Sequence, residues 1–286
     1  MQANRGCYSL RALCTSLQVS RSGYYAWCDR DKSPCPLNQA IERQFKQDKA
    51  RAGAPSIAHA LQQTGMVCSI RTVGRRMQRL GLRARYAKKF KRTTDSRHSH
   101  AVVPNHLARQ FVVGAPNRVW VGDITYLRTT QGWLYLAVFI DLFSRRVVGW
   151  QLSERIDAQL VCDALQAAML MRGKPKGVLI HSDQGSQYCS AGFVKQVAHF
   201  KAMQSMSRRG NCWDNAVMER FFLNLKMERV WQRDYANHNE AIHDIADYIV
   251  TFYNNLRLHS TLGYLPPAVY EQNMANTQPI SLSEKI

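Results

Sequence analysis

The stretch RVWVGDITYL, residues 118–127, indicates the fold, because its β-branched and aromatic residues alternate as they do in a half-buried strand. In such a strand Val121, Asp123 and Thr125 point to the same side. An acid on a core strand needs a reason, because an unpaired buried charge is costly. The stretch therefore predicts a strand and marks Asp123 as a candidate functional carboxylate.

The residues that follow continue this pattern. Two more β-rich segments, joined by a tight Phe143-Ser144 turn, predict a hairpin. Alternating helical and extended patterns come next. Three strands followed by this alternation predict an α/β domain with a mixed sheet. The expected elements are strands 133–142 and 145–152, helix 157–171, strand 177–182, helix 190–200, a short strand near 203 and helix 214–229.

Two further acids occupy prominent places in this layout. Asp183 follows a short buried strand, at the carboxyl end where open α/β sheets form their sites. Glu219 lies near the start of a helix. Three acids brought together repel one another unless a hard cation such as Mg²⁺ binds their oxygens. The alternative is separate pairing, with Asp183 capping a turn and Glu219 paired to Arg220 or Lys226.

Positive charge is concentrated in the first part of the chain. The 286 residues hold 39 Lys and Arg against 20 Asp and Glu, a net charge of +19. Residues 1–110 hold 21 basic and 5 acidic residues, whereas residues 111–286 hold 18 and 15. This asymmetry predicts a polyanion-binding region joined to a nearly neutral domain.

Several classes of protein are excluded. No apolar run approaches the ~20 residues of a membrane span. Arg5 and Arg11 interrupt any apolar stretch near the N-terminus, so we expect no signal peptide. The eight cysteines form no Cys-x-x-Cys pair, which argues against a zinc site or a disulfide framework.

Two basic segments predict helix-turn-helix units. In the first, Ser20 is a candidate N-cap, and in the second Ser69 caps a helix that begins at Ile70. A solvated amphipathic hairpin is the alternative, but such faces usually mix charges and residues 71–92 contain no acid. We therefore expect phosphate contacts along this stripe. The candidate DNA-binding residues are Arg71, Arg75, Arg76, Arg79, Arg83, Arg85, Lys88 and Lys89.

Three blocks of the sequence resemble the catalytic blocks of integrase-like transposases. They are WVGDITYL (120–127), HSDQGSQY (181–188) and DNAVMERFFLNLK (214–226). The 35 residues between Asp183 and Glu219 match the spacing of that Asp-Asp-Glu family. DLFSRRVVGW (141–150), YNNLRLHSTLGYLPPAVYE (253–271), VSRSGYYAW (19–27) and GLRAR (81–85) resemble further blocks. Over essentially its whole length the chain resembles the second-reading-frame (OrfB) product of the insertion-sequence-three family of bacterial transposases.

The resemblance implies an RNase H-like, retroviral-integrase-like catalytic core with an all-α helix-turn-helix N-terminal region. It implies that Asp123, Asp183 and Glu219 form a catalytic triad that binds two Mg²⁺ ions, with Mn²⁺ as a possible substitute. The implied activity is DNA cleavage at transposon ends, followed by strand transfer by the freed 3′-hydroxyl. Asn215 and Lys226 share a helix face with Glu219. We expect Asn215 to support the site and Lys226 to contact DNA phosphate.

The expected organisation has five parts: helix-turn-helix regions at 1–50 and 51–95, a basic linker at 96–115, the catalytic core at 116–235 and a C-terminal helical tail at 236–286. We expect DNA as partner, a homo-oligomer assembled on it, and a first-frame (OrfA) protein or fusion. The expected location is the bacterial cytoplasm, in association with the nucleoid. Two other functions stay open, namely a DNA-binding regulator with an inert α/β part and a structure-directed nuclease without strand transfer.

Overall fold

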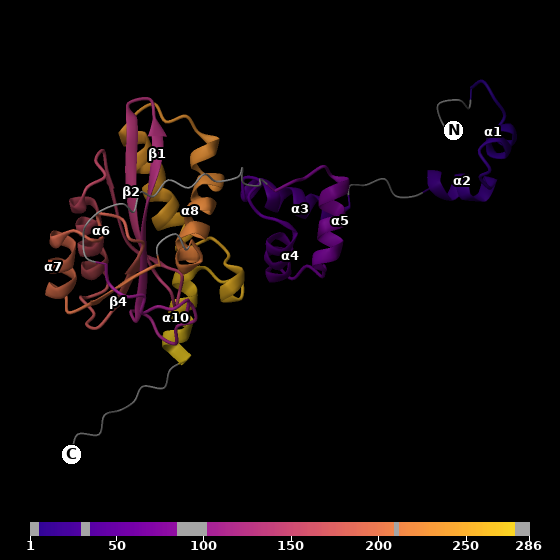
Figure 1. The fold of residues 1–286 in the computed structure, drawn as a ribbon. Coiled ribbons are helices and arrows are strands. Elements are labelled where there is room, and N and C mark those ends of the chain that lie inside the picture. Colours follow the sequence, from indigo (N-terminus) through magenta and orange to yellow (C-terminus); the bar gives the residue numbers. More distant parts are fainter. Residues whose placement is uncertain (1–5, 30–34, 85–101, 209–211, 278–286) are drawn as a thin grey trace, which may run out of the picture.

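The structure is a computed structural model that describes residues 6–29, 35–84, 102–208 and 212–277. Figure 1 shows an α/β core and two groups of N-terminal helices. No helix in these ranges is long and apolar enough to cross a membrane.

The core is built on one mixed sheet of five strands in the order β3-β2-β1-β4-β5. β1–β2 and β2–β3 pair antiparallel, and β1–β4 and β4–β5 pair parallel. The expected hairpin and mixed sheet are therefore confirmed. The strands are β1 (Val119–Thr129), β2 (Gly132–Asp141), β3 (Val147–Ser153), β4 (Leu179–Ser182) and β5 (Met203–Met206).

Helices cover both faces of the sheet (Figure 1). On one face Trp120 and Phe139 pack against α6 (Ala158–Met171) and α7 (Ala191–His199). On the other face Val121 and Leu127 pack against α8 (Ala216–Glu228) and α9 (His238–Asp247). Alternate residues of β1 thus enter two separate apolar layers, as the alternating sequence predicts.

The C-terminal segment packs on the same face as α8. It comprises α9, the π-helix η4 (Tyr248–Tyr253), the 3₁₀-helix η5 (Ser260–Leu262) and α10 (Pro267–Thr277). Tyr248 and Ile249 are almost completely buried in the layer that also holds Phe221 of α8. This segment therefore completes one half of the core.

Five helices precede the core in the part of the chain that the structure describes, and two of them begin after the serine caps that the sequence predicts. The first group holds α1 (Leu10–Ser16) and α2 (Arg21–Cys28), and the Ser20 hydroxyl accepts the Gly23 N–H at 3.0 Å. The second holds α3 (Pro36–Gln47), α4 (Ala54–Gln63) and α5 (Ile70–Arg79), and the Ser69 hydroxyl accepts the Thr72 N–H at 3.1 Å.

Helix α3 adds a third member to the second group. Its Ile41 and Phe45 are buried with Ile57 of α4 and Val73 of α5 in one small apolar cluster. The helix lies N-terminal to residue 50, where the sequence suggested a boundary, yet it packs with the helices that follow. The reason is that α4 and α5 are short and need its apolar face to enclose a core.

Candidate active site

Parallel pairing of β1 and β4 places the two aspartates at neighbouring strands. Val121 of β1 is in register with His181 of β4. Asp123 lies two residues further along β1, and Asp183 directly follows the end of β4. Because the two strands run in the same direction, Asp123 lies level with the carboxyl end of β4, which Asp183 follows.

Glu219 comes from the opposite layer. It lies in the first turn of α8 and is exposed, whereas Asp123 and Asp183 are partly buried. The charges of both other acids act on Asp123. Burial of the Asp123 carboxylate raises its pKa well above the usual range, and the charges of Asp183 and then Glu219 raise it further. Asp123 and Asp183 thus lie on neighbouring strands, and the charge of Glu219 acts on Asp123 from helix α8.

The arrangement fits a divalent metal. Closely spaced carboxylates are hard oxygen donors, and Asp123 is destabilised as an anion without more positive charge nearby. Buried Asn215, beside the start of α8, adds an Oδ1 atom that has no hydrogen-bond partner among the described residues. Within those residues, no three His, Cys, Asp or Glu side chains meet as ligands of a single ion. Mg²⁺ usually takes only one or two protein carboxylates and completes its shell with water and substrate oxygens.

A close approach holds the Asp183 carboxylate. Its Oδ1 accepts the Gly185 N–H at 2.9 Å, and a Cβ atom on Gly185 would lie only 3.0 Å from that oxygen. Glycine at this position leaves room for the carboxylate beside the backbone.

Lys226 of α8 and Asn215, which directly precedes that helix, are buried close to Asp123. Lys226 is only 5% exposed, and its Nζ lies 4.5 Å from the ring centroid of Tyr126. Burial lowers the Lys226 pKa and the Asp123 charge opposes that shift. The Lys226 ammonium is therefore not a surface group, and its charge lies close enough to Asp123 to interact with that carboxylate. The Asn215 amide points its Nδ2 at the Gly122 carbonyl, 3.5 Å away, next to Asp123.

Other nearby acids have structural partners. Asp141 accepts the backbone N–H groups of Asn117 and Phe143 and so orders the hairpin turn. Glu228, at the far end of α8, accepts hydrogen bonds from Arg257 and the Tyr248 hydroxyl. Neither acid joins the three candidate acids.

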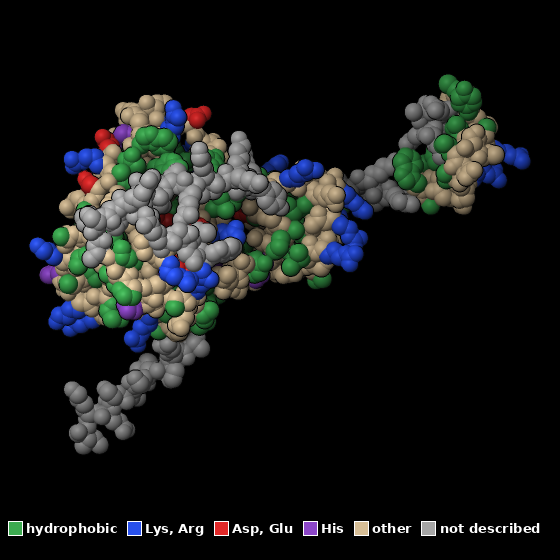
Figure 2. Space-filling model, in the orientation of Figure 1, with side chains coloured by type: hydrophobic (Ala, Val, Ile, Leu, Met, Phe, Trp, Pro, Cys, Tyr) green, Lys and Arg blue, Asp and Glu red, His purple; other side chains and the backbone are tan. Residues whose placement is uncertain are grey.

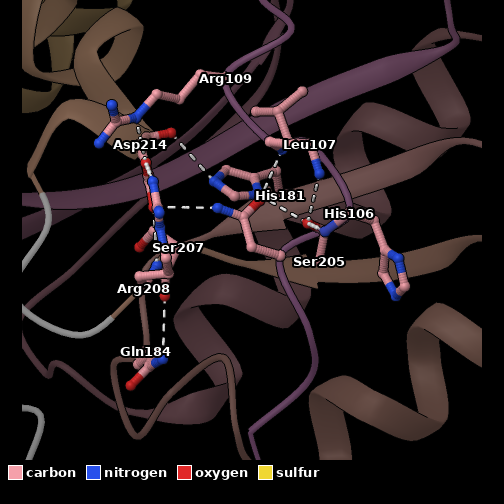
Figure 3. A network of polar contacts seen from close by, with 11 residues as sticks. His106, Leu107, Arg109, His181, Gln184, Ser205, Ser207, Arg208 and Asp214 are labelled. Carbon is pink, nitrogen blue, oxygen red and sulfur yellow. Dashed lines mark hydrogen bonds and ion pairs between the residues drawn. The ribbon is translucent and has the colours of Figure 1, made fainter.

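A polar network beside the acids was missed by the sequence interpretation. Figure 3 shows Ser205 of β5 and Asp214, just before α8, each hydrogen-bonded to His181 of β4. The segment before β1 is bonded to Ser205 and to Asp214. The sequence pattern marks Asp214 only as the start of the expected helix 214–229. The sequence signal that could have pointed to this network is Asp214 itself, a second acid in the block 214–226 that contains Glu219.

The candidate DNA-binding residues have different environments. Arg71, Arg75 and Arg79 are exposed on α5, and Arg83 is exposed just after it. Figure 2 shows Lys and Arg side chains gathered on the side of the helical group where α5 lies. Arg76 is partly buried and donates to Asn38 Oδ1 of α3 at 2.7 Å. The remaining candidates, Arg85, Lys88 and Lys89, lie outside the described residues.

Comparison with known families supports this organisation. Residues 114–212 and 201–267 match two integrase core domain families, and residues 36–90 match an HTH-like domain. Among solved structures, the magnesium complex of the HTLV-2 integrase catalytic core in its trimeric form is similar at a TM-score of 0.43. It has 19% identity and covers 55% of this chain and 97% of that chain.

Relatives of similar length are closer in sequence. The transposase InsF for insertion sequence IS3A of Escherichia coli K12 is 40% identical over 276 residues, covering 94% of this chain and 96% of the relative. The 31 kDa protein of insertion element IS600 from Shigella sonnei is 38% identical over 267 residues, covering 91% and 97%. With identity at this level along nearly the whole chain, the protein belongs to the insertion-sequence-three family of transposases.

Proposed function

We propose that this transposase cleaves DNA at transposon ends and joins the freed 3′-hydroxyl to a target strand at Asp123, Asp183 and Glu219. The observation that supports the proposal is the parallel pairing of β1 and β4, which places Asp123 and Asp183 on neighbouring strands; burial and the charges of Asp183 and Glu219 raise the Asp123 pKa. The acids would hold two Mg²⁺ ions, with Mn²⁺ as a substitute. When bound, such ions activate the attacking hydroxyl and stabilise the leaving oxygen.

The chain's own residues contribute rigidity and charge. The Ile124 N–H binds Asp123 Oδ1 at 2.7 Å, and the Gly185 N–H binds Asp183 Oδ1, so both aspartates have fixed orientations. Glu219 is exposed on α8 and completes the site from the side that DNA approaches. The buried Lys226 adds positive charge beside Asp123, and we propose that it also meets a DNA phosphate. Because charge stabilisation drives phosphoryl transfer, no covalent protein nucleophile is needed.

The test replaces each acid by its amide. Asp123→Asn, Asp183→Asn and Glu219→Gln should each abolish cleavage and joining of labelled end DNA in Mg²⁺ while leaving DNA affinity unchanged. Glu154→Gln, at an exposed acid elsewhere on the core, is the matched control and should keep normal activity. Near-normal strand transfer by Glu219→Gln would show that the triad is misassigned.

The joined product separates the remaining candidates. A structure-directed nuclease would release cut DNA without forming a new phosphodiester bond, and a DNA-binding regulator would do neither. A labelled end with a free 3′-hydroxyl, incubated with target plasmid, therefore reports strand transfer directly.

We also propose that the enzyme acts as a homo-oligomer assembled on DNA at the nucleoid. Two DNA ends must be held at once, and the excess positive charge opposes self-association until DNA neutralises it. A first-frame (OrfA) protein or fusion is a further proposed partner, and co-purification of the two products would detect it.

Complementation tests action in trans. Asp183→Asn protein is mixed with a variant that has Arg83, Arg85, Lys88 and Lys89 changed to Ala. Restored joining is expected, because one subunit would bind the DNA that the other cuts. If soluble partners restore nothing while the alanine variant still cuts short DNA, each monomer acts on its own DNA.

A further inference from the structure

The carboxylate of Asp214 forms a dense set of hydrogen bonds near the site. Its side chain is fully buried. Its two oxygens accept five hydrogen bonds of 2.8–3.1 Å, from Asn105 Nδ2, Arg109 Nε and the backbone N–H, Nε and Nη2 of Arg208. The hydrogen bonds from Arg208 are the main cause of its strongly lowered pKa, so Asp214 is held as an anion.

Two of these donors belong to a segment that precedes the sheet. We call residues 105–109 the strap, since they cross from the start of the core to β5 and η2 (Cys212–Asn215). The backbone N–H groups of His106 and Leu107 donate to Ser205 Oγ at 2.9 and 3.2 Å. The strap is therefore fastened at Ser205 and at Asp214 (Figure 3).

His181 joins the same network from β4. Its side chain is fully buried, with Nδ1 at 2.9 Å from Ser205 Oγ and Nε2 at 3.2 Å from the Asp214 carbonyl oxygen. Because the Ser205 hydroxyl accepts two strap N–H groups, we assign its own proton to His181 Nδ1. His181 Nε2–H then donates to Asp214. Burial lowers the His181 pKa to about 4, consistent with this neutral tautomer.

The connection matters because of where the two partners lie in the sequence. His181 is two residues before Asp183, and Asp214 is five residues before Glu219. A second hydrogen bond joins the same two segments of the chain, since Gln184 Nε2 donates to the Ser207 carbonyl at 3.0 Å. The hydrogen bond from His181 to Asp214 thus links the end of β4 directly to the start of α8.

We propose that His181 and Asp214 are positioning residues that set the spacing between the Asp183 and Glu219 carboxylates, with the strap holding Asp214 in place. This rests on the proposed function of those acids. Neither positioning residue touches DNA in the proposed mechanism. A misplacement of ~1 Å in a reacting group costs roughly 10²-fold in rate.

A matched control lies elsewhere in the core. Asp244 on α9 is also a buried acid that binds arginines, with Arg229 at 2.8 Å and Arg233 at 3.1 Å, and it accepts the Tyr235 hydroxyl at 2.8 Å. Its network links α8, α9 and the loop between them. Asp244→Asn therefore disturbs a comparable cluster without disturbing the contact between His181 and Asp214.

The first experiment compares Asp214→Asn with Asp244→Asn in the full chain. Asp214→Asn should lower the single-turnover cleavage rate roughly 10- to 100-fold at unchanged DNA Kd. It should also speed hydrogen exchange at the Arg208 amide and along the strap. Asp244→Asn should lower Tm about as much as Asp214→Asn does, and should leave the cleavage rate within about threefold of the native rate. Equal rate losses in the two variants, or a normal rate in Asp214→Asn despite faster exchange, would overturn the proposal.

The second experiment tests the donor at His181. His181→Gln keeps an N–H that reaches the Asp214 carbonyl, whereas His181→Leu keeps only volume. Cleavage by His181→Gln should exceed that by His181→Leu at least tenfold at matched Tm, and equal rates would overturn the proposal. Glu219→Gln distinguishes failure of the proposed function from failure of the positioning proposal. If the Glu219→Gln protein stays active, the catalytic assignment of the acids fails. If that protein is inactive while Asp214→Asn has a normal rate, only the positioning role of His181 and Asp214 fails.

Discussion

The guanidinium of Arg51 lies over the ring of Phe252, with its carbon 4.2 Å from the ring centroid. Arg51 sits between α3 and α4, and Phe252 belongs to η4 of the core, so the helical group and the core are in contact. The rings of His59 and Tyr264 stack nearby at 4.9 Å. Helix α5, which carries the exposed Arg71, Arg75 and Arg79, lies on the side of the helical group away from the core (Figure 1).

Removing the Arg51 contact should loosen this attachment. A partly desolvated cation–π pair contributes about 1–2 kcal/mol, so Arg51→Ala should lower the docking equilibrium about 5- to 30-fold. We expect a larger radius of gyration by small-angle X-ray scattering without DNA. Arg43→Ala, at an exposed arginine of α3, is the control. An unchanged scattering profile for Arg51→Ala would contradict the prediction.

Neighbouring arginines of α5 should behave differently. Arg75 is exposed, whereas Arg76 donates to Asn38 and to Cys35 Sγ within the helical group. Arg75→Ala should weaken DNA binding and reduce the log–log salt slope by about 0.9, the value for one lost phosphate contact. Arg76→Ala should mainly lower Tm. Fluorescence anisotropy over a range of salt concentrations measures both slopes, and an equal loss of slope in the two variants would refute this distinction.

Space beside the Asp183 carboxylate should limit activity. In Gly185→Ala the new Cβ would lie 3.0 Å from Asp183 Oδ1 and 3.1 Å from Gln187 Oε1, so the carboxylate must shift by a few tenths of an ångström. We expect cleavage to fall roughly tenfold with little change in Tm. Gly192→Ala is the control, because nothing lies within 4 Å of its Cβ and alanine favours the helix. A fully active Gly185→Ala would show that the carboxylate tolerates this shift.

The Asp214 network should make stability depend on acid pH. The folded-state pKa of Asp214 is lowered, chiefly by Arg208, so its contribution is fully present above the unfolded value of about 4 and is lost as pH falls below it. The difference in unfolding free energy between the native protein and Asp214→Asn should therefore be constant from pH 7 to 5 and shrink toward pH 3. Urea titrations at these pH values measure it. A difference that grows on acidification would contradict the sign of the shift.

The sequence by itself determined the local elements and the identity of the acids. The alternation around Asp123 fixed β1 and its two apolar faces, because a strand has a period of two. Ser20 and Ser69 marked helix starts, because a hydroxyl before the first turn binds a free backbone N–H. The motif spacing singled out Asp183 and Glu219 before any geometry was known.

Only the tertiary structure decided which side chains far apart in the sequence contact one another. Arg76 has the same local pattern as Arg75, yet it bonds Asn38, which lies 38 positions away. Arg109 meets Asp214 across 105 positions, and Lys226 is buried against Tyr126 of another element. Periodicity and capping arise from contacts within one or two turns of chain. Burial, charge pairing and the spacing of the acids depend on how separate elements pack, and no local pattern encodes that distance.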